Sequence, residues 1–153
     1  WEVVFFLTAA LVAITDQLTK TWVRTYDEGY TIFRTGLFQL IHIRNTGAAF
    51  GMFQSYSFIL TVVTIFVMFA ILLTVLFFWR RFNIFGNLLG RTAVGLYFGG
   101  AIGNLIDRLR FGYVTDFVDF RIWPVFNVAD AAMTVGVIMF IYSILFLSKA
   151  EKG

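Results

Sequence analysis

Long runs of apolar residues dominate the chain and predict helices that cross a membrane. A transmembrane helix needs about 20 predominantly apolar residues, because each residue adds about 1.5 Å to a bilayer core of about 30 Å. Two stretches, 58–79 and 125–147, reach this length with at most one charged residue each. Both are therefore predicted to span the membrane.

Two further spans are predicted from less uniform stretches. Residues 3–23 are long enough only if Asp16 and Lys20 lie in or near the bilayer, and their four-residue spacing puts them on one helix face where they can pair. Residues 88–109 are apolar in the middle and polar towards both ends. Four crossings place both termini on the same side of the membrane.

Two segments between these spans have the composition of β-structure. Residues 30–44 and 111–120 are rich in β-branched and aromatic side chains, and Thr35–Gly36 is a turn candidate. Both segments lie on the same face, because two crossings separate them. The prediction is an all-α polytopic membrane protein, one domain over residues 1–153, with four transmembrane helices and a small interfacial β-hairpin or cradle.

Composition narrows the possible chemistry. Of the 153 residues 59% are hydrophobic and 14% charged, which excludes an ordinary soluble domain. With no cysteine and only one histidine, His42, the chain offers no disulfide, no thiol nucleophile and no histidine-rich metal site. The net charge of +3 favours acidic phospholipids as the anionic partner, not nucleic acid.

Basic residues do not decide the orientation of the chain. Arg80 and Arg81, with Lys149 and Lys152 in the tail, favour a cytoplasmic location for one face. The opposite face carries more basic residues: Lys20, Arg24, Arg34, Arg44, Arg108, Arg110 and Arg121. The positive-inside rule alone leaves the question open.

Acidic residues gather at one end of the predicted bundle. The set consists of Asp16, Asp107, Asp116, Asp119 and Asp130. An intramembrane carboxylate costs about 2.5–3.5 kcal/mol even on lenient insertion scales, so each needs a partner or a function. Asp16 with Lys20, and Asp107 with Arg108, are interpreted as structural ion pairs.

Asp116 and Asp130 have no basic neighbour at helical spacing. The structural alternatives are a solvated loop acid for Asp116 and, for Asp130, a capping box with Asn127 as the helix N-cap. If the two carboxylates approach within about 4 Å, they repel by about 4 kcal/mol at an effective dielectric of about 20, and one keeps its proton near neutral pH. Such a pair supplies a base and an acid, with Asp130 at a helix N-terminus as the ionised member.

Small residues mark two further places. Gly95, Gly99 and Gly103 recur every four residues and predict a flat face for close helix packing. Gly47, in a second patch with Gly51, fits close backbone approach either to a neighbour or to a ligand.

Five polar or glycine-containing segments follow one another along the chain. They are Asp16-Gln-x-x-Lys20 and residues 44–50 (RNTGAAF), 99–108 (GGAIGNLIDR), 112–117 (GYVTDF) and 126–130 (FNVAD). Together they resemble the motifs of the bacterial lipoprotein signal peptidases, the signal peptidase II family. Two features depart from the family pattern: Thr115 precedes Asp116 where an apolar residue is expected, and the stretch 117–129 is short.

The resemblance implies an inner-membrane aspartic endopeptidase without metal or cofactor. We expect the protein to be a monomer. Its substrate would be a diacylglyceryl-modified prolipoprotein, cut just before the lipidated cysteine, near the extracytoplasmic leaflet, with both termini cytoplasmic. Carried over by motif, the catalytic residues are Asp116 and Asp130. Asn45, Gly47, Asn104, Arg108 and Asn127 would bind substrate, and Asp16, Lys20 and Asp107 would support the site.

Two other classes remain open from the residues alone. A proton or cation transporter or channel subunit could use the clustered aspartates, although four spans would require oligomerisation and no inverted repeat is visible. A structural assembly subunit could use the glycine faces. Rhomboid-like, site-2-like and presenilin-like proteases are excluded because their GxSG, HExxH and GxGD motifs are absent.

Overall fold

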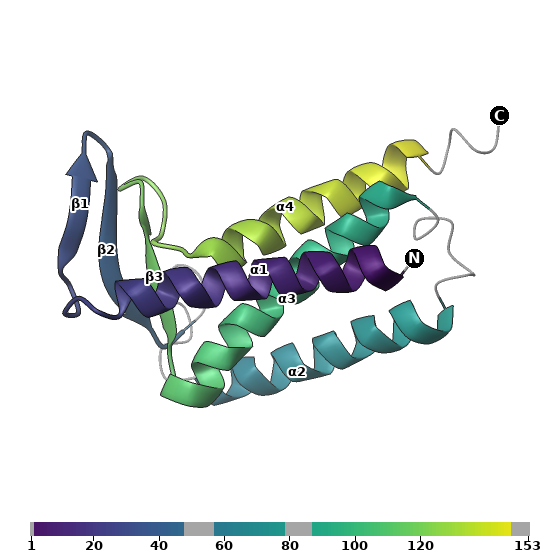
Figure 1. Ribbon diagram of the computed structural model, residues 1–153, viewed down its shortest axis with the longest axis horizontal. Coiled ribbons are helices and arrows are strands. Elements are labelled where there is room, and N and C mark those ends of the chain that lie inside the picture. Colours follow the sequence, from purple (N-terminus) through teal and green to yellow (C-terminus); the bar gives the residue numbers. More distant parts are fainter. Residues whose placement is uncertain (1, 48–56, 79–86, 148–153) are drawn as a thin grey trace.

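A computed structural model describes residues 2–47, 57–78 and 87–147. These residues form four long helices and a three-stranded sheet (Figure 1). The elements are α1 (Glu2–Val23), β1 (Thr31–Thr35), β2 (Phe38–Asn45), α2 (Ser57–Leu73) with a π-helical end (Thr74–Phe78), α3 (Leu88–Phe111), β3 (Val114–Asp119), and α4 (Val128–Tyr142) with a π-helical end (Ser143–Leu147). The sheet lies at one end of the helices, and the start of α1 and the end of α4 lie at the other (Figure 1).

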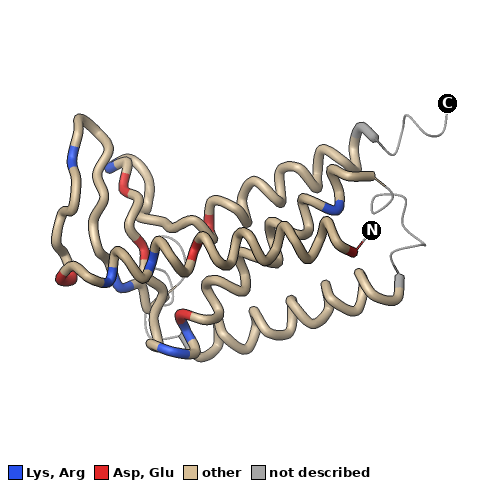
Figure 2. Tube along the Cα trace, viewed as in Figure 1, with Lys and Arg blue, Asp and Glu red and all other residues tan. Residues whose placement is uncertain are grey.

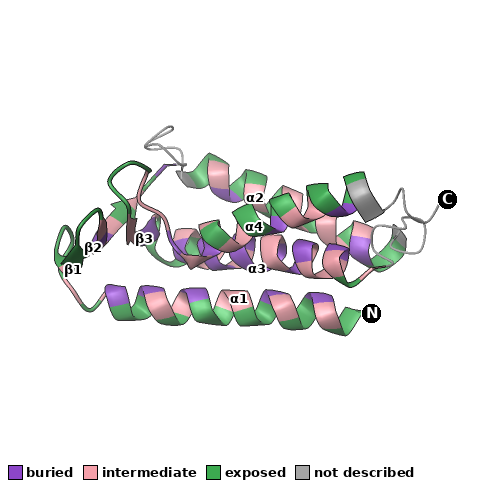
Figure 3. Cartoon of the chain, turned by 90° about the horizontal axis from the view of Figure 1, so that it is seen from above, coloured by how far each residue is buried: buried purple, intermediate pink, exposed green. Residues whose placement is uncertain are grey.

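Three helical segments are long and apolar enough to cross a membrane: Glu2–Val23, Phe58–Phe77 and Val128–Leu145. Their apolar side chains point outwards to an extent that would be unfavourable in water; Phe58 is 78% exposed and Phe66 is 73% exposed. Figure 3 shows this exposed surface along the outer sides of α1 and α2. A multi-pass membrane protein explains the pattern, because lipid replaces a protein interior as the apolar partner.

Helix α3 lies at the centre and contacts α1, α2 and α4. Its glycines allow this, as predicted. A Cβ atom at Gly99 would meet the backbone of Ala9 on α1, and one at Gly100 would meet the backbone of Ala129 on α4. A Cβ atom at Gly103 would collide with the carboxylate of Asp16. The small-residue face therefore brings α1 against α3 and leaves room for a buried charge.

The two predicted β segments form a single antiparallel sheet with strand order β1-β2-β3. The predicted turn is present, with Gly36 at a φ of 52° between β1 and β2. Helix α3 ends at Phe111, and its C-cap Gly112, with a φ of 78°, turns the chain into β3. The register of β2 with β3 pairs Ile43 with Asp116, which places Asn45 near that carboxylate.

The predicted helix over 125–147 begins three residues later, at Val128, because Asn127 caps it. The remaining helical predictions agree with the structure to within two residues over the described ranges. Several residues used in the sequence analysis lie outside the described residues: Ala48, Ala49, Phe50, Gly51, Trp79, Arg80, Arg81, Lys149 and Lys152.

Candidate active site

The side chain and backbone of Asn127 connect the two aspartates that the sequence singled out. Its side-chain Nδ2 donates to Asp116 Oδ1 on β3 at 2.7 Å. Its backbone N–H donates to Asp130 Oδ2 in the first turn of α4 at 3.3 Å. Residues from a strand and a helix start are thus brought to the two sides of one buried asparagine. Figure 2 shows that most charged residues gather at this sheet end of the helices.

Two more predicted site residues complete this cluster. Asn45 at the end of β2 donates from Nδ2 to Asp116 Oδ2 at 2.9 Å, while its Oδ1 accepts from the Gly47 N–H at 2.9 Å. Asn104 on α3 donates from Nδ2 to Asp130 Oδ1 at 2.8 Å. Each carboxylate oxygen of the pair therefore accepts a hydrogen bond from an amide N–H.

The structural interpretation of Asp130 is also confirmed. Asn127 Oδ1 accepts from the Asp130 N–H at 3.0 Å, and the Asp130 carboxylate accepts from the Asn127 N–H, so both halves of the capping box are present. Asp130 can cap the helix and have a chemical role at the same time. The capping geometry fixes the rotamer of Asp130 and directs its second oxygen towards Asn104.

The pKa of Asp116 is raised to about 7. The largest cause is burial, which disfavours the charged carboxylate, and the charge of Asp130 adds to it. The hydrogen bonds from Asn45 and Asn127 act in the opposite direction, as does the charge of Lys20. Asp116 therefore holds a proton near neutral pH although three groups around it favour its ionised form.

A buried charge network lies on the α1 side of the site. Lys20 Nζ lies 2.8 Å from Asp16 Oδ2, which confirms the predicted pair, and 3.5 Å from Asp107 Oδ2. The prediction that Asp107 pairs with the adjacent Arg108 is wrong. Asp107 instead pairs with Arg24 at 3.2 Å and with Lys20, because consecutive residues on a helix point in different directions.

Asp16 and Asp107 also bind backbone of the elements that carry the two aspartates. Asp16 Oδ1 accepts from the Ala129 N–H on α4 at 2.9 Å. Asp107 Oδ2 accepts from the Thr115 N–H on β3 at 2.8 Å. Helix α1 and the end of α3 thereby hold the residue next to each aspartate of the pair.

Sequence reasoning missed Arg24, Gln17 and the role of Thr115. Arg24 donates to Thr115 Oγ1 at 3.1 Å as well as to Asp107, and Gln17 donates to Asp107 Oδ1 at 3.2 Å. One signal was available for Arg24, since it follows Lys20 by four residues on the same helix face. Arg108 is half-buried with the charges of Asp130 and Asp116 acting on its guanidinium, and its side chain forms no hydrogen bond with another described residue.

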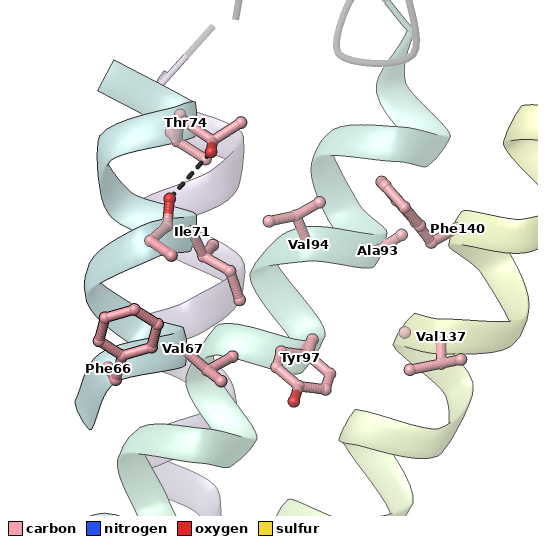
Figure 4. Close-up of a pocket in the computed structure, with 12 residues that line it drawn as sticks. Phe66, Val67, Ile71, Thr74, Ala93, Val94, Tyr97, Val137 and Phe140 are labelled. Atoms are coloured by element: carbon pink, nitrogen blue, oxygen red, sulfur yellow. Dashed lines mark hydrogen bonds between the residues drawn. The ribbon is translucent and has the colours of Figure 1, made fainter. Parts of the chain in front are cut away.

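An apolar cavity of about 430 Å³ lies between α2, α3 and α4 (Figure 4). Its lining includes Phe66 and Ala70 of α2, Tyr97 of α3, and Val137 and Phe140 of α4. Val137 follows Asp130 by seven residues, about 10 Å along the helix at 1.5 Å per residue. Within the described ranges, no group of three or more His, Asp or Glu side chains is placed to hold a metal ion.

Comparison with known proteins identifies the family. The family model described as signal peptidase (SPase) II matches residues 8–146. The chain belongs to the signal peptidase II family. It is similar to the lipoprotein signal peptidase of Moorella thermoacetica, with 42% identity covering 97% of each chain. It is also similar to that of Dehalococcoides mccartyi (strain ATCC BAA-2266), with 37% identity covering 98% of this chain and 92% of the relative.

A solved structure described as a bacterial membrane enzyme, determined by the in meso method at 2.3 Å, superposes with a TM-score of 0.83. It is 32% identical and the match covers 97% of this chain and 91% of that chain. Membership of the signal peptidase II family makes the chain a lipoprotein-processing protease. The transporter and assembly-subunit alternatives are therefore not retained.

Proposed function

We propose that Asp116 and Asp130 are the catalytic dyad of this signal peptidase II. The observation that carries the proposal is the bridging by Asn127, which holds the two carboxylates in one hydrogen-bonded cluster. The raised pKa of Asp116, about 7, supports a division of labour in which Asp116 is the acid and Asp130 the base. The pair titrates as one unit, so these roles describe its single-proton state.

In the proposed reaction, ionised Asp130 takes a proton from a water molecule held between the carboxylates. The resulting hydroxide attacks the scissile peptide carbonyl, and protonated Asp116 donates a hydrogen bond to the developing oxyanion. Collapse of the tetrahedral intermediate breaks the C–N bond, and a proton from the pair passes to the leaving amine. Burial of Asp116 favours this cycle because the neutral acid is stable there at neutral pH.

The proposed substrate is a prolipoprotein whose cysteine carries a diacylglyceryl group, cut just before that cysteine. Asn45, Asn104, Asn127 and the backbone at Gly47 border the pair and could hold an extended peptide by hydrogen bonds. Arg108 adds a cationic group near both carboxylates that makes no hydrogen bond with the other described residues. It is suited to bind a substrate carbonyl or the oxyanion.

We propose that the apolar cavity takes an acyl chain of this substrate. Its lining is almost wholly apolar and it lies between three helices, deeper in the helical layer than the aspartates. The distance of about 10 Å from Asp130 to Val137 along α4 fits a lipid tail attached next to the scissile bond. A hydrocarbon chain gains by leaving a polar interface for such a cavity.

We further propose that α3 is a fourth crossing, which makes residues 1–153 a single four-helix domain. Its 24 residues extend about 36 Å, and its polar side chains Asn104 and Asp107 are buried against α1 and α4, where lipid does not reach them. The sheet end would then face the extracytoplasmic leaflet and both termini the cytoplasm. A monomer among phospholipids suffices, because one chain supplies every residue of the cluster.

Replacing either aspartate tests the dyad. Asp116→Asn and Asp130→Asn should each abolish cleavage of a lipidated precursor while membrane insertion and thermal stability in detergent are retained. Asp119→Asn is a matched control, since Asp119 lies on the same strand but binds Gln39 and the Arg121 N–H instead. Normal processing by either dyad variant would refute the proposal.

A further inference from the structure

Three asparagine amides surround the aspartate pair, and in each the nitrogen faces a carboxylate while the oxygen is held by another donor. For Asn127 that donor is the Asp130 N–H, and for Asn45 it is the Gly47 N–H. Both are backbone groups within three residues of the asparagine. Asn104 differs, because its Oδ1 accepts from a charged side chain on another helix, Lys20, at 2.8 Å.

Lys20 is completely buried in the middle of the charge network. Its ammonium group lies 2.8 Å from Asp16 and 3.5 Å from Asp107. These two carboxylates account for its charge as a structural residue. The bond to Asn104 is not needed for charge neutrality, yet it is as short as the ion pair with Asp16.

An ammonium group can only donate hydrogen bonds, so the atom of Asn104 that faces Lys20 has to be the amide oxygen. The other end of the amide is then Nδ2, which donates to Asp130 Oδ1 at 2.8 Å. The reverse orientation would place Nδ2 against the ammonium and Oδ1 against the carboxylate, two repulsive contacts in a buried site. Asn127 Nδ2 also donates to Asn104 Oδ1, but at 3.1 Å and from a neutral group.

We propose that Lys20 is a positioning residue for catalysis, which orients the Asn104 amide so that its N–H stabilises the ionised carboxylate of Asp130. The proposal rests on the dyad described above. It assigns to Lys20 a chemical task besides its ion pairs. Through this residue, α1 acts on the catalytic base Asp130 by way of Asn104 on α3. Lys20 itself does not touch the reacting atoms in this scheme.

The proposal is tested by the acidic limb of the pH profile of kcat/KM, which reports ionisation of the base. In Lys20→Met the Asn104 amide loses its strongest orienting contact and Asp130 loses a well-directed donor. The acidic limb should then move to higher pH by about one unit. Lys20→Met also removes a charge that lowers the pKa of Asp116 on β3, so the alkaline limb should move to higher pH as well, while Arg108 on α3 stays in place.

Gln17→Leu is the matched control. Gln17 lies on the same helix and loses bonds to Asp107 and the Gly103 carbonyl, but has no hydrogen bond to Asn104. Its acidic limb should stay in place even if its melting temperature falls. Where Lys20→Met does not fold, Asp16→Asn with Lys20→Met removes both charges together and keeps an oxygen for the Ala129 N–H.

A double-mutant cycle separates action through Asn104 from a direct effect of the Lys20 charge. Single-turnover assays with excess enzyme keep weakly active variants measurable. If Lys20 acts through Asn104, the limb shift caused by Lys20→Met should vanish in an Asn104→Ala background. The same shift in both backgrounds, or no shift in either, would overturn the proposal. If Asp116→Asn or Asp130→Asn is active, the dyad itself has failed, a result distinct from an unshifted Lys20→Met profile.

Discussion

Asn127 caps helix α4 with its side-chain oxygen and holds Asp116 with its side-chain nitrogen at 2.7 Å. Asparagine is a common helix N-cap residue, and the nitrogen of its side-chain amide usually faces solvent. Here the cap is buried, so the orientation that stabilises the helix also directs a donor at a strand residue. One side chain therefore couples the start of α4 to the position of Asp116.

Substitutions at Asn127 should separate these two functions. Asn127→Ser keeps a capping oxygen but loses the amide donor, so we expect near-native thermal stability with activity reduced about tenfold or more. Asn127→Ala loses both and should also be about 1 kcal/mol less stable. Unfolding in detergent and cleavage of a lipidated precursor measure the two effects. Equal activity of the serine variant and the parent would contradict the assigned role.

Activity should fall on the alkaline side of about pH 7, because Asp116 then loses the proton that makes it the acid.

The free energy of unfolding should also depend on pH through the carboxyl group of Asp116. Folded Asp116 keeps its proton up to about pH 7, whereas the unfolded chain releases it near the ordinary value of 3.8. In that window the folded state binds more protons, so its stability falls as pH rises from about 4 to 7.

The measurement is the melting temperature as a function of pH for the parent and for Asp116→Asn. The melting temperature of the parent should fall relative to that of Asp116→Asn as pH rises across this window, since the asparagine cannot ionise. Parallel curves would show that burial of Asp116 does not penalise its charged form.

Thr115, which departs from the family pattern, should contribute to stability more than to chemistry. Thr115→Val removes the hydroxyl that accepts from Arg24 but keeps the backbone bond to Asp107. We expect the free energy of unfolding to fall by about 0.5–1.5 kcal/mol and activity to stay within about twofold of the parent.

Asp107→Ala should lower the free energy of unfolding by about 3–5 kcal/mol, because Lys20 and Arg24 then lose a buried counter-charge. Chemical denaturation in micelles ranks the two variants.

Filling the apolar cavity should discriminate between substrates by acyl chain length. Ala70→Trp places a large ring at the lining of the cavity, so KM for a long-chain diacyl substrate should rise at least about fivefold, with a smaller change for a short-chain analogue. Ile65→Trp is the control, since Ile65 lies on α2, is exposed and does not line the cavity. An equal effect of both variants on both substrates would rule out the acyl-chain assignment.

A feature of this protein could be predicted from its sequence when the interactions that produce it act between residues close together in the chain. Apolar length alone predicted α2 and α4, because lipid imposes about 20 apolar residues on any crossing regardless of its neighbours, and α1 followed once the pairing of Asp16 with Lys20 was allowed for. The i, i+4 pair of Asp16 and Lys20 was also readable, since both lie on one helix face. Partners on other elements were not: the sequence suggested Arg108 for Asp107, whereas the fold supplies Arg24, which directly follows α1.

The sequence by itself determined that this is a membrane protein, where its helices and strands lie, and that Asp116 and Asp130 stand apart from the paired acids. Those conclusions depend on hydropathy, helix periodicity and local capping, which act within a few turns of the chain. Only the tertiary structure decided which oxygen and which nitrogen face each other around the two carboxylates. That arrangement requires three asparagines and a lysine from β2, α1, α3 and the start of α4 to meet at one point, and only their packing brings them there.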